Sequence, residues 1–131
     1  MLSGEGGITD VLSTRMTSSL VFRVSAILGF FAVALGAFGA HGLKSLLARN
    51  STTAIWETAA LYHLVHAGVL LFVADRKPFC PGAWRSFAAG ILIFSGSLYL
   101  LAVTNVGWLG AVTPIGGVCL LAGWLTLAIR R

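Results

Sequence analysis

Four long apolar stretches, separated by short polar links, follow one another along this chain. Each stretch is long enough to cross the hydrocarbon core of a bilayer as an α-helix, which takes about 20 residues. The links are "KSLLARNSTT", "DRKPFCPG" and "TNVG", and the two prolines of the second link are typical of a helix end. The pattern predicts membrane-spanning helices at about residues 20–42, 54–74, 84–103 and 108–129.

The first 19 residues differ in character from the rest of the chain. The stretch "MLSGEGGITDVLSTRMTSS" is polar, contains three glycines and has only a weak apolar pattern. It predicts a flexible N-terminal tail over residues 1–19, in which a short helix near Val11 to Met16 remains open, followed by a four-helix transmembrane domain over residues 20–131. The apolar run after the tail is about 20 residues long, whereas the apolar region of a cleaved signal peptide has about 7–15. An uncleaved anchor is therefore favoured.

The composition supports lipid as the main solvent. Of the 131 residues, 57% are hydrophobic and only 10% are charged, with a mean hydropathy of +0.91. Soluble domains carry about 25% charged residues, so this chain has too few charges to cover a surface that faces water. We therefore expect an all-α, polytopic membrane protein with four transmembrane helices in an antiparallel bundle.

The charged residues also predict an orientation. Nine Lys and Arg against four Asp and Glu give a net charge of +5, but the cations lie at segment ends and form no basic stripe, which argues against nucleic-acid binding. With four spans, one side of the membrane would hold seven cations: Arg15, Arg23, Arg76, Lys77, Arg85, Arg130 and Arg131. The other side would hold only Lys44 and Arg49. The positive-inside rule then places both termini in the cytoplasm.

Small residues and one proline bear on how the helices pack. Helices in lipid associate through close backbone approach and interhelical hydrogen bonds, so small residues on one face predict a packing surface. The first span carries such a track, three to four residues apart, at Gly29, Ala32, Gly36 and Ala40. In the fourth span, Pro114 cannot donate to the carbonyl of Gly110. We expect the helix to kink or open there.

The candidate chemistry lies in a few polar side chains within the spans. His63 and His66 are three residues apart and share a helix face, which should point into the bundle because ionisable groups avoid lipid. At 1.5 Å per residue, this pair lies near mid-membrane, at the depth of polar or helix-breaking positions in the last two spans. The predicted polar layer comprises His63, His66, Ser95, Ser97, Tyr99, Thr113, Pro114, Gly116 and Gly117. His41 and Glu57 are predicted to form a separate outer pair.

Three interpretations of this layer remain open. Neutral imidazoles could bond to Tyr99, Ser97 or backbone carbonyls and so hold spans together. The layer could instead form a path for protons or small solutes through His66, Ser95 and Thr113. A haem or metal site is the third, but two histidines supply fewer than the three or four ligands that most such sites need, so no cofactor and no metal are predicted. No nucleophile, base and orienting group are placed together as in an enzyme.

Several motifs, taken in order, resemble those of a known family. They are "GAFGAHGL" (36–43), "WETAALYHLVHA" (56–67), "FSGSLYLLA" (94–102), "TPIGG" (113–117) and "GW" (123–124). The chain resembles the domain of unknown function 423 family, to which animal transmembrane protein 256 is also similar. The resemblance implies a four-helix integral protein of the bacterial inner membrane, or its organellar equivalent, without an established activity. The shared motifs fall on His41, Trp56, Tyr62, His66, Ser95, Ser97, Tyr99, Pro114, Gly116 and Gly117.

The short links and the small-residue faces favour a protein that acts by binding. We expect a non-enzymatic accessory, assembly or structural subunit whose partners are the lipid bilayer and other membrane subunits or itself. A small transporter or channel that uses the polar layer is the alternative, and haem or quinone binding within the bundle is a third hypothesis.

Overall fold

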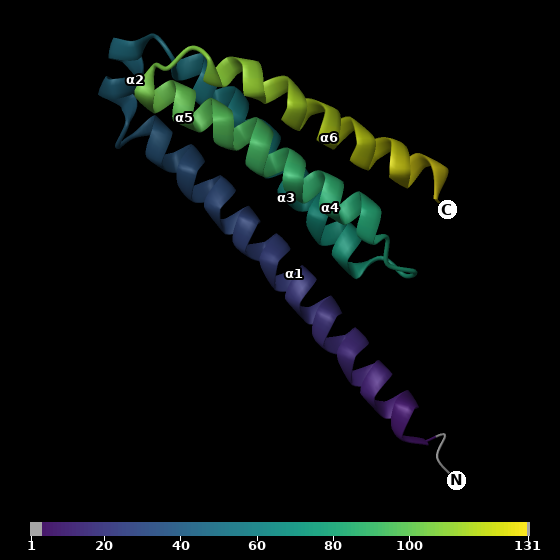
Figure 1. Cartoon of the computed structure of the whole chain (residues 1–131). Coiled ribbons are helices and arrows are strands. Elements are labelled where there is room, and N and C mark those ends of the chain that lie inside the picture. Colours follow the sequence, from purple (N-terminus) through teal and green to yellow (C-terminus); the bar gives the residue numbers. More distant parts are fainter. Residues whose placement is uncertain (1–3, 131) are drawn as a thin grey trace.

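The computed structural model describes residues 4–130, and every element in this part of the chain is a helix. The elements, shown in Figure 1, are α1 (Gly4–Ala40), α2 (Lys44–Asn50), α3 (Thr53–Asp75), α4 (Pro81–Gly90), the π-helix η1 (Ile91–Ser95), α5 (Gly96–Thr104) and α6 (Leu109–Ile129). α4, η1 and α5 follow one another without a break and form one long helix. The all-α fold class is confirmed.

Four of these helices are long and apolar enough to cross a membrane. They cover Gly6–Ala40, Thr53–Asp75, Pro81–Thr104 and Leu109–Ile129. The predicted number of spans is therefore confirmed, and the three later spans begin and end within a few residues of the predicted positions. Their strongly apolar composition identifies the chain as a polytopic membrane protein.

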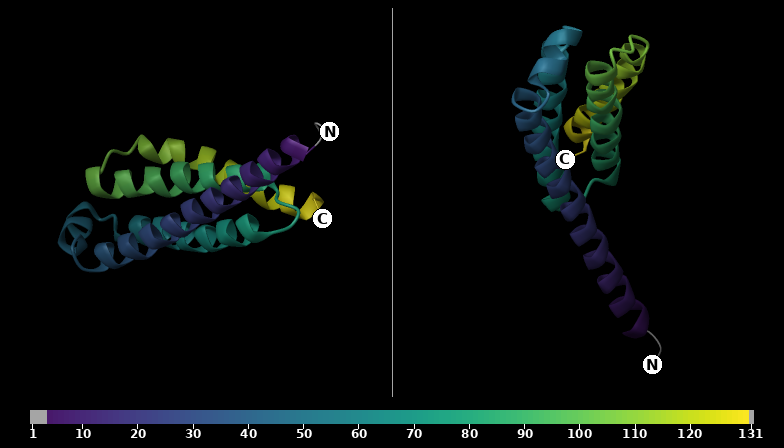
Figure 2. Two further views of the ribbon diagram at one scale, coloured as in Figure 1. Left: turned by 90° about the horizontal axis from the view of Figure 1, so that it is seen from below. Right: turned by 90° about the vertical axis from the view of Figure 1, so that its left-hand side faces the viewer.

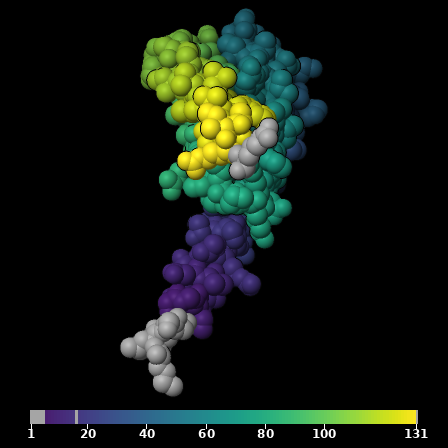
Figure 3. Space-filling model, turned by 90° about the vertical axis from the view of Figure 1, so that its right-hand side faces the viewer, coloured from purple at the N-terminus to yellow at the C-terminus, as the bar shows by residue number. Residues whose placement is uncertain are grey.

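The N-terminal segment differs from the expectation. α1 begins at Gly4, so residues 4–19 of the predicted tail continue into the first span as one helix, and residues 1–3 lie outside the described part of the chain. Side-chain hydroxyls of this segment, including those of Thr14, Thr17 and Ser18, bond to carbonyls three or four residues earlier, which satisfies them within the helix. At 1.5 Å per residue, the 37 residues of α1 extend about 55 Å, well beyond the ~30 Å hydrocarbon core. Figure 3 shows the N-terminal part projecting from the body of the molecule.

The spans are arranged as neighbours in sequence order. α1 packs along α3, α3 packs on the long helix α4–η1–α5, and α6 packs on the other side of that helix. Within residues 4–130, no close backbone contact joins α1 to α6 or α3 to α6. Figure 2 shows the four spans from two further directions, with α1 crossing the others at an angle. The turn between α5 and α6 lies at the same end as α2, and the α3–α4 loop lies at the opposite end (Figure 1).

Two clusters of buried apolar side chains lie near the two ends of the bundle. The larger one joins α3, α4, η1 and α6 and contains Leu70, Val73, Cys80, Ala83, Phe87, Ile91 and Leu120. The smaller one, at the α2 end, contains Leu47, Trp56 and Ala102. α1 contributes no fully buried residue to either cluster, so the core is formed by the rest of the chain.

Glycines permit the closest approach between the long helix and α6. A Cβ added to Gly116 would overlap the backbone N and Cα of Phe94 in η1. A Cβ at Gly90 would overlap Leu120, and one at Gly123 would come within 2.8 Å of the Phe87 ring. Because lipid gives helices little reason to hide apolar surface from one another, such backbone contact is a main source of their association.

Side chains of the α2–α3 link cap the C-terminal end of α5. The last carbonyls of a helix lack partners within the helix. Asn50 donates from Nδ2 to the carbonyls of Ala102 and Val103, each at 3.1 Å, and Thr52 Oγ1 donates to Ala102 O at 2.7 Å. Ser51 between them has a φ of 55°, a left-handed conformation that ends α2. The short link thereby attaches the end of the third span to the start of the second.

Of the two outcomes predicted at Pro114, a kink or an opening of the fourth span, the opening does not occur. α6 is helical from Leu109 to Ile129 with the proline inside it. The residues around the proline are held from outside, because Thr113 bonds to Ser97 of α5 and Gly116 packs on Phe94 of η1. These contacts keep the helix closed despite the missing N–H.

We expect Gly116→Ala to destabilise the protein by about 1–3 kcal/mol, because the added methyl group must displace the backbone of η1. The measurement is unfolding in mixed micelles by titration with a denaturing detergent, followed by circular dichroism. Gly68→Ala is the matched control, since a Cβ there meets nothing within 4 Å, and it should be neutral or stabilising by up to about 1 kcal/mol. Equal effects of the two variants would contradict the role of Gly116.

Candidate functional site

His63 lies in α3 on the side that faces α5 and α1. Its ring is buried, and Nδ1 lies 3.2 Å from the hydroxyl of Tyr99 in α5. The Tyr99 ring packs in turn on the indole of Trp56, with centroids 4.6 Å apart. Nε2 of His63 is buried and makes no hydrogen bond of good geometry in the described part of the chain, although the backbone of Leu28 in α1 lies beside the ring. Nδ1 therefore links α3 to α5, and the same ring lies beside α1.

His66 lies one turn further along α3 and is bonded at both nitrogens. Its Nδ1 is 2.8 Å from the carbonyl oxygen of Tyr62, and the indole Nε1 of Trp124 in α6 donates to its Nε2 over 3.2 Å. An indole N–H only donates and a carbonyl only accepts, so Nε2 must be unprotonated and Nδ1 must carry the proton. The geometry thus selects one neutral tautomer. Protonation of Nε2 would break the bond to Trp124.

A surface groove lies beside His66, between α3 and α6. It has a volume of about 440 Å³ and is lined by Tyr62, His66, Phe94, Pro114 and Trp124 among others. The lining is aromatic and apolar, and the rings of Tyr62 and Phe94 pack with centroids 4.5 Å apart. Since both nitrogens of His66 are already bonded, the groove offers a ligand mainly apolar contact.

Hydroxyl groups make two further links between spans. Ser95 Oγ in η1 donates to the carbonyl of Ala59 in α3 over 2.9 Å. Ser97 Oγ in α5 lies 2.7 Å from Thr113 Oγ1 in α6, and both residues are buried. In hydrocarbon, each of these hydroxyls would be costly without a partner.

Several of the predicted polar residues form pairs between spans. His63 meets Tyr99, Ser97 meets Thr113, and Ser95 meets a backbone carbonyl. His66 faces α6 and its groove, away from the pair formed by His63. Of the remaining predicted residues, Pro114 and Gly117 line the groove beside His66, and Gly116 forms the close contact with η1.

No hydrogen bond or ion pair joins the two predicted outer residues in the described part of the chain. His41 and Glu57 are both exposed. Glu57 lines a small pocket of about 250 Å³ with Lys44, and His41 is not part of that lining.

The predicted small-residue track of α1 is divided along its length. Gly29 and Ala32 face α3, where a Cβ added to Gly29 would lie 4.0 Å from Ala67 and where Ala32 is buried. Gly36 and Ala40 line the small pocket beside Trp56. The closest approach is made instead by Gly39, where a Cβ would overlap the Trp56 indole.

Three of the four tryptophans take part in bonds between spans that sequence reasoning missed. Trp56 donates to the carbonyl of Leu35 over 3.0 Å, Trp84 to Ser25 Oγ over 2.9 Å, and Trp124 to His66. The sequence does indicate that such bonds form, because an indole N–H placed among apolar residues needs an acceptor. What the sequence could not supply was the identity of each acceptor, since all of them lie on other helices.

The described residues offer little to a metal ion. Within residues 4–130, no group of three or more His, Cys, Asp or Glu side chains is placed to hold one. Cys80 and Cys119 are free thiols, the first buried in the larger apolar cluster and the second partly exposed.

We expect Trp124→Phe to lower the free energy of unfolding in micelles by about 0.6–1.7 kcal/mol. This range runs from the average to the largest contribution of one side-chain hydrogen bond between helices in a membrane. Loss of the indole leaves Nε2 of His66 without its donor. Trp108→Phe is the matched control, because that side chain is 68% exposed and packs on no core cluster. An unfolding midpoint that shifts equally in the two variants would argue against the bond.

Comparison with known proteins identifies relatives along most of the chain. A model of the family described as Protein of unknown function (DUF423) matches residues 35–117. The chain is 41% identical over 113 residues to the UPF0382 membrane protein YwdK of Bacillus subtilis, which covers 81% of this chain and 90% of that protein. It is 44% identical over 108 residues to a UPF0382 membrane protein of Haemophilus influenzae, covering 79% and 86%.

A further relative carries a more specific location in its name. The UPF0382 inner membrane protein YgdD of Escherichia coli is 39% identical over 119 residues, covering 87% of this chain and 90% of that protein. The names of these three relatives state no enzymatic activity. No solved structure matches the chain significantly. With a family match over most of its membrane-spanning part and relatives of about 40% identity along most of its length, this chain belongs to the DUF423 family of membrane proteins.

Proposed function

We propose that the protein is a non-enzymatic accessory, assembly or structural subunit that acts by binding other helices within the membrane. The observation that carries this proposal is the exposure of α1. Only 11% of its most apolar stretch is buried, against 39% for α3, and α1 packs mainly on that one neighbour. Its outward face is available to a partner helix or to a second copy of the chain.

The outward face of α1 is built from large apolar side chains. Ile27, Phe30, Val33 and Phe38 are each between 53% and 68% exposed. Phe30 and Phe31 pack edge to face, which presents a double aromatic projection on one side of the helix. Aromatic side chains contribute large contact areas to protein interfaces. The same face in an isolated copy would contact lipid.

The bonding of the polar side chains also favours a structural role. The groups that a conduit would use, among them His66, Ser95 and Thr113, each bond to another helix or to their own backbone. A transporter or channel, the alternative function, requires water along a continuous row of such groups. Binding of haem or a quinone at His66 would require displacement of the Trp124 indole.

A photoreactive amino acid at position 30 tests the binding role in native membranes. We expect Phe30→p-benzoylphenylalanine to yield a discrete protein adduct after illumination, identified by mass spectrometry as this chain or a partner. The matched control is the same substitution at Leu121 in α6, which is 69% exposed against 68% for Phe30. Adducts with lipid alone at position 30, or equal protein adducts at both positions, would contradict the assignment to α1.

We further propose that both termini lie in the cytoplasm of the bacterial cell, with the protein in the inner membrane. The end that carries the α3–α4 loop holds Arg76 and Lys77, and the N-terminal end of α1 adds Arg15 and Arg23. The α2 end holds only Lys44 and Arg49. This asymmetry supports the orientation through the positive-inside rule.

Reporter fusions check that orientation. We expect a fluorescent protein fused to the C-terminus to be fluorescent, and an alkaline phosphatase fused after Asn50 to be active, because that enzyme requires the oxidising exterior. A phosphatase fused to the C-terminus is the control and should be inactive. Activity at the C-terminus with inactivity after Asn50 would reverse the orientation.

A further inference from the structure

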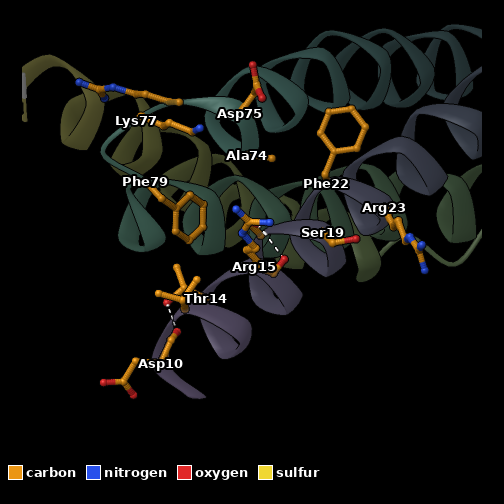
Figure 4. Close-up of a pocket in the computed structure, with 13 residues that line it drawn as sticks. Asp10, Thr14, Arg15, Ser19, Phe22, Arg23, Ala74, Asp75, Lys77 and Phe79 are labelled. Atoms are coloured by element: carbon orange, nitrogen blue, oxygen red, sulfur yellow. Dashed lines mark hydrogen bonds between the residues drawn. The ribbon is translucent and has the colours of Figure 1, made fainter. Parts of the chain in front are cut away.

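A cavity lies where the N-terminal part of α1 passes the α3–α4 loop. Its volume is about 780 Å³, and it is enclosed on one side by residues 10–23 of α1 and on the other by residues 74–79. Figure 4 shows Phe22 and Phe79 extending from the two sides, with Arg15 between them. Val11 and Ala74 add further apolar surface to the lining. The cavity is thus partly apolar and lies outside the polar pairs of the spans.

The charges that line this cavity are mostly positive. Arg15, Arg23, Arg76 and Lys77 are four cations, and Asp10 and Asp75 are two anions, so the net charge of the lining is +2. None of these side chains forms an ion pair within the described part of the chain. The cationic groups therefore remain available to an anion.

One contact keeps a further cation close to the cavity. Arg76 donates from Nη2 to the carbonyl oxygen of Arg130 over 2.6 Å, which attaches the end of α6 to the α3–α4 loop. Arg130 itself is exposed at this end of the molecule. The local positive charge thus extends past the lining.

The position of the cavity matches the boundary of the membrane. α3 ends at Asp75 and α4 begins at Pro81, so the loop between them lies where two spans leave the hydrocarbon. Lipid phosphates lie at this depth, just outside the acyl chains. Basic residues in such positions attract anionic lipids.

We propose that this cavity binds the headgroup of an anionic phospholipid, with its phosphate held by Arg15 and Lys77 and the start of an acyl chain against Phe22 and Phe79. The combination of unpaired cations and apolar rings fits an amphiphile with one anionic end. An inorganic anion would use the cations alone. The N-terminal part of α1, which projects past the bundle, supplies one side of this site. The proposal is independent of what covers the outward face of α1 within the membrane.

Native mass spectrometry of the full chain in a neutral detergent tests the proposal. The probes are dioleoylphosphatidylglycerol and dioleoylphosphatidylcholine, added separately to delipidated protein, and the readout is the fraction of protein that retains lipid. We expect the wild type to prefer phosphatidylglycerol and Arg15→Gln/Lys77→Gln to weaken its retention by about twenty-five-fold, about fivefold for each cation removed. Neither side chain forms a bond that holds the fold.

Lys44→Gln/Arg49→Gln is the matched control, since it removes one Lys and one Arg from the α2 end and should leave retention unchanged. The proposal is overturned if both double variants lose retention equally, or if the wild type retains the two lipids alike. A further arm adds inorganic phosphate at millimolar concentration, which should not displace the lipid. Displacement by phosphate alone would overturn the assignment to a lipid and indicate a simple anion site.

Discussion

Polar groups in hydrocarbon need partners, and this constraint accounts for how the four spans are joined. Among the spans in residues 4–130, backbone packing connects only those that are successive in the chain, from α1 to α3, to α4–η1–α5 and to α6. The tryptophans add links across that order, because Trp84 joins α4 to α1 and Trp124 joins α6 to α3. Hydroxyl bonds from Ser95 and Ser97 strengthen the middle of the row. Hydrogen bonds between side chains therefore close an arrangement that packing alone would leave open.

The π-helix lies at the centre of this arrangement. Ser95, in η1, bonds to α3. Ser97, two residues later in α5, bonds to α6, so the two hydroxyls link the long helix to two different neighbours. Immediately before Ser95, the backbone of Phe94 contacts Gly116 directly. π-helical turns inside α-helices are uncommon and occur frequently at functional positions. Here the irregular turn coincides with the place where one helix meets both of its neighbours.

The sequence predicted the features that depend on local composition. Hydropathy and turn residues placed the later spans within a few residues of their positions. Tyr99 was among the groups expected to bond the histidines, and its hydroxyl lies within hydrogen-bond distance of His63. Features that depend on distant contacts were not predictable. The π-helix, the acceptor chosen by Trp124 and the cap that Asn50 forms on α5 all require knowledge of which helices touch. The continuous extension of α1 back to Gly4 was not predicted beyond a short helix near Val11 to Met16, because hydropathy reports burial in lipid rather than helix formation in water.

α1 stands apart from the rest of the bundle in a way that favours binding over rearrangement. The fully buried residues of the two apolar clusters come from the other helices, and α1 adds only the partly buried Leu28 and Leu35 on its inner side, so a ligand on the outward side of α1 would leave the core unchanged. Within the membrane that side presents Phe30 to lipid or protein, and beyond it Arg15 faces the boundary. Because its backbone is hydrogen-bonded within the helix, α1 can be covered by either kind of partner without refolding. Its function would then depend on which surface is occupied.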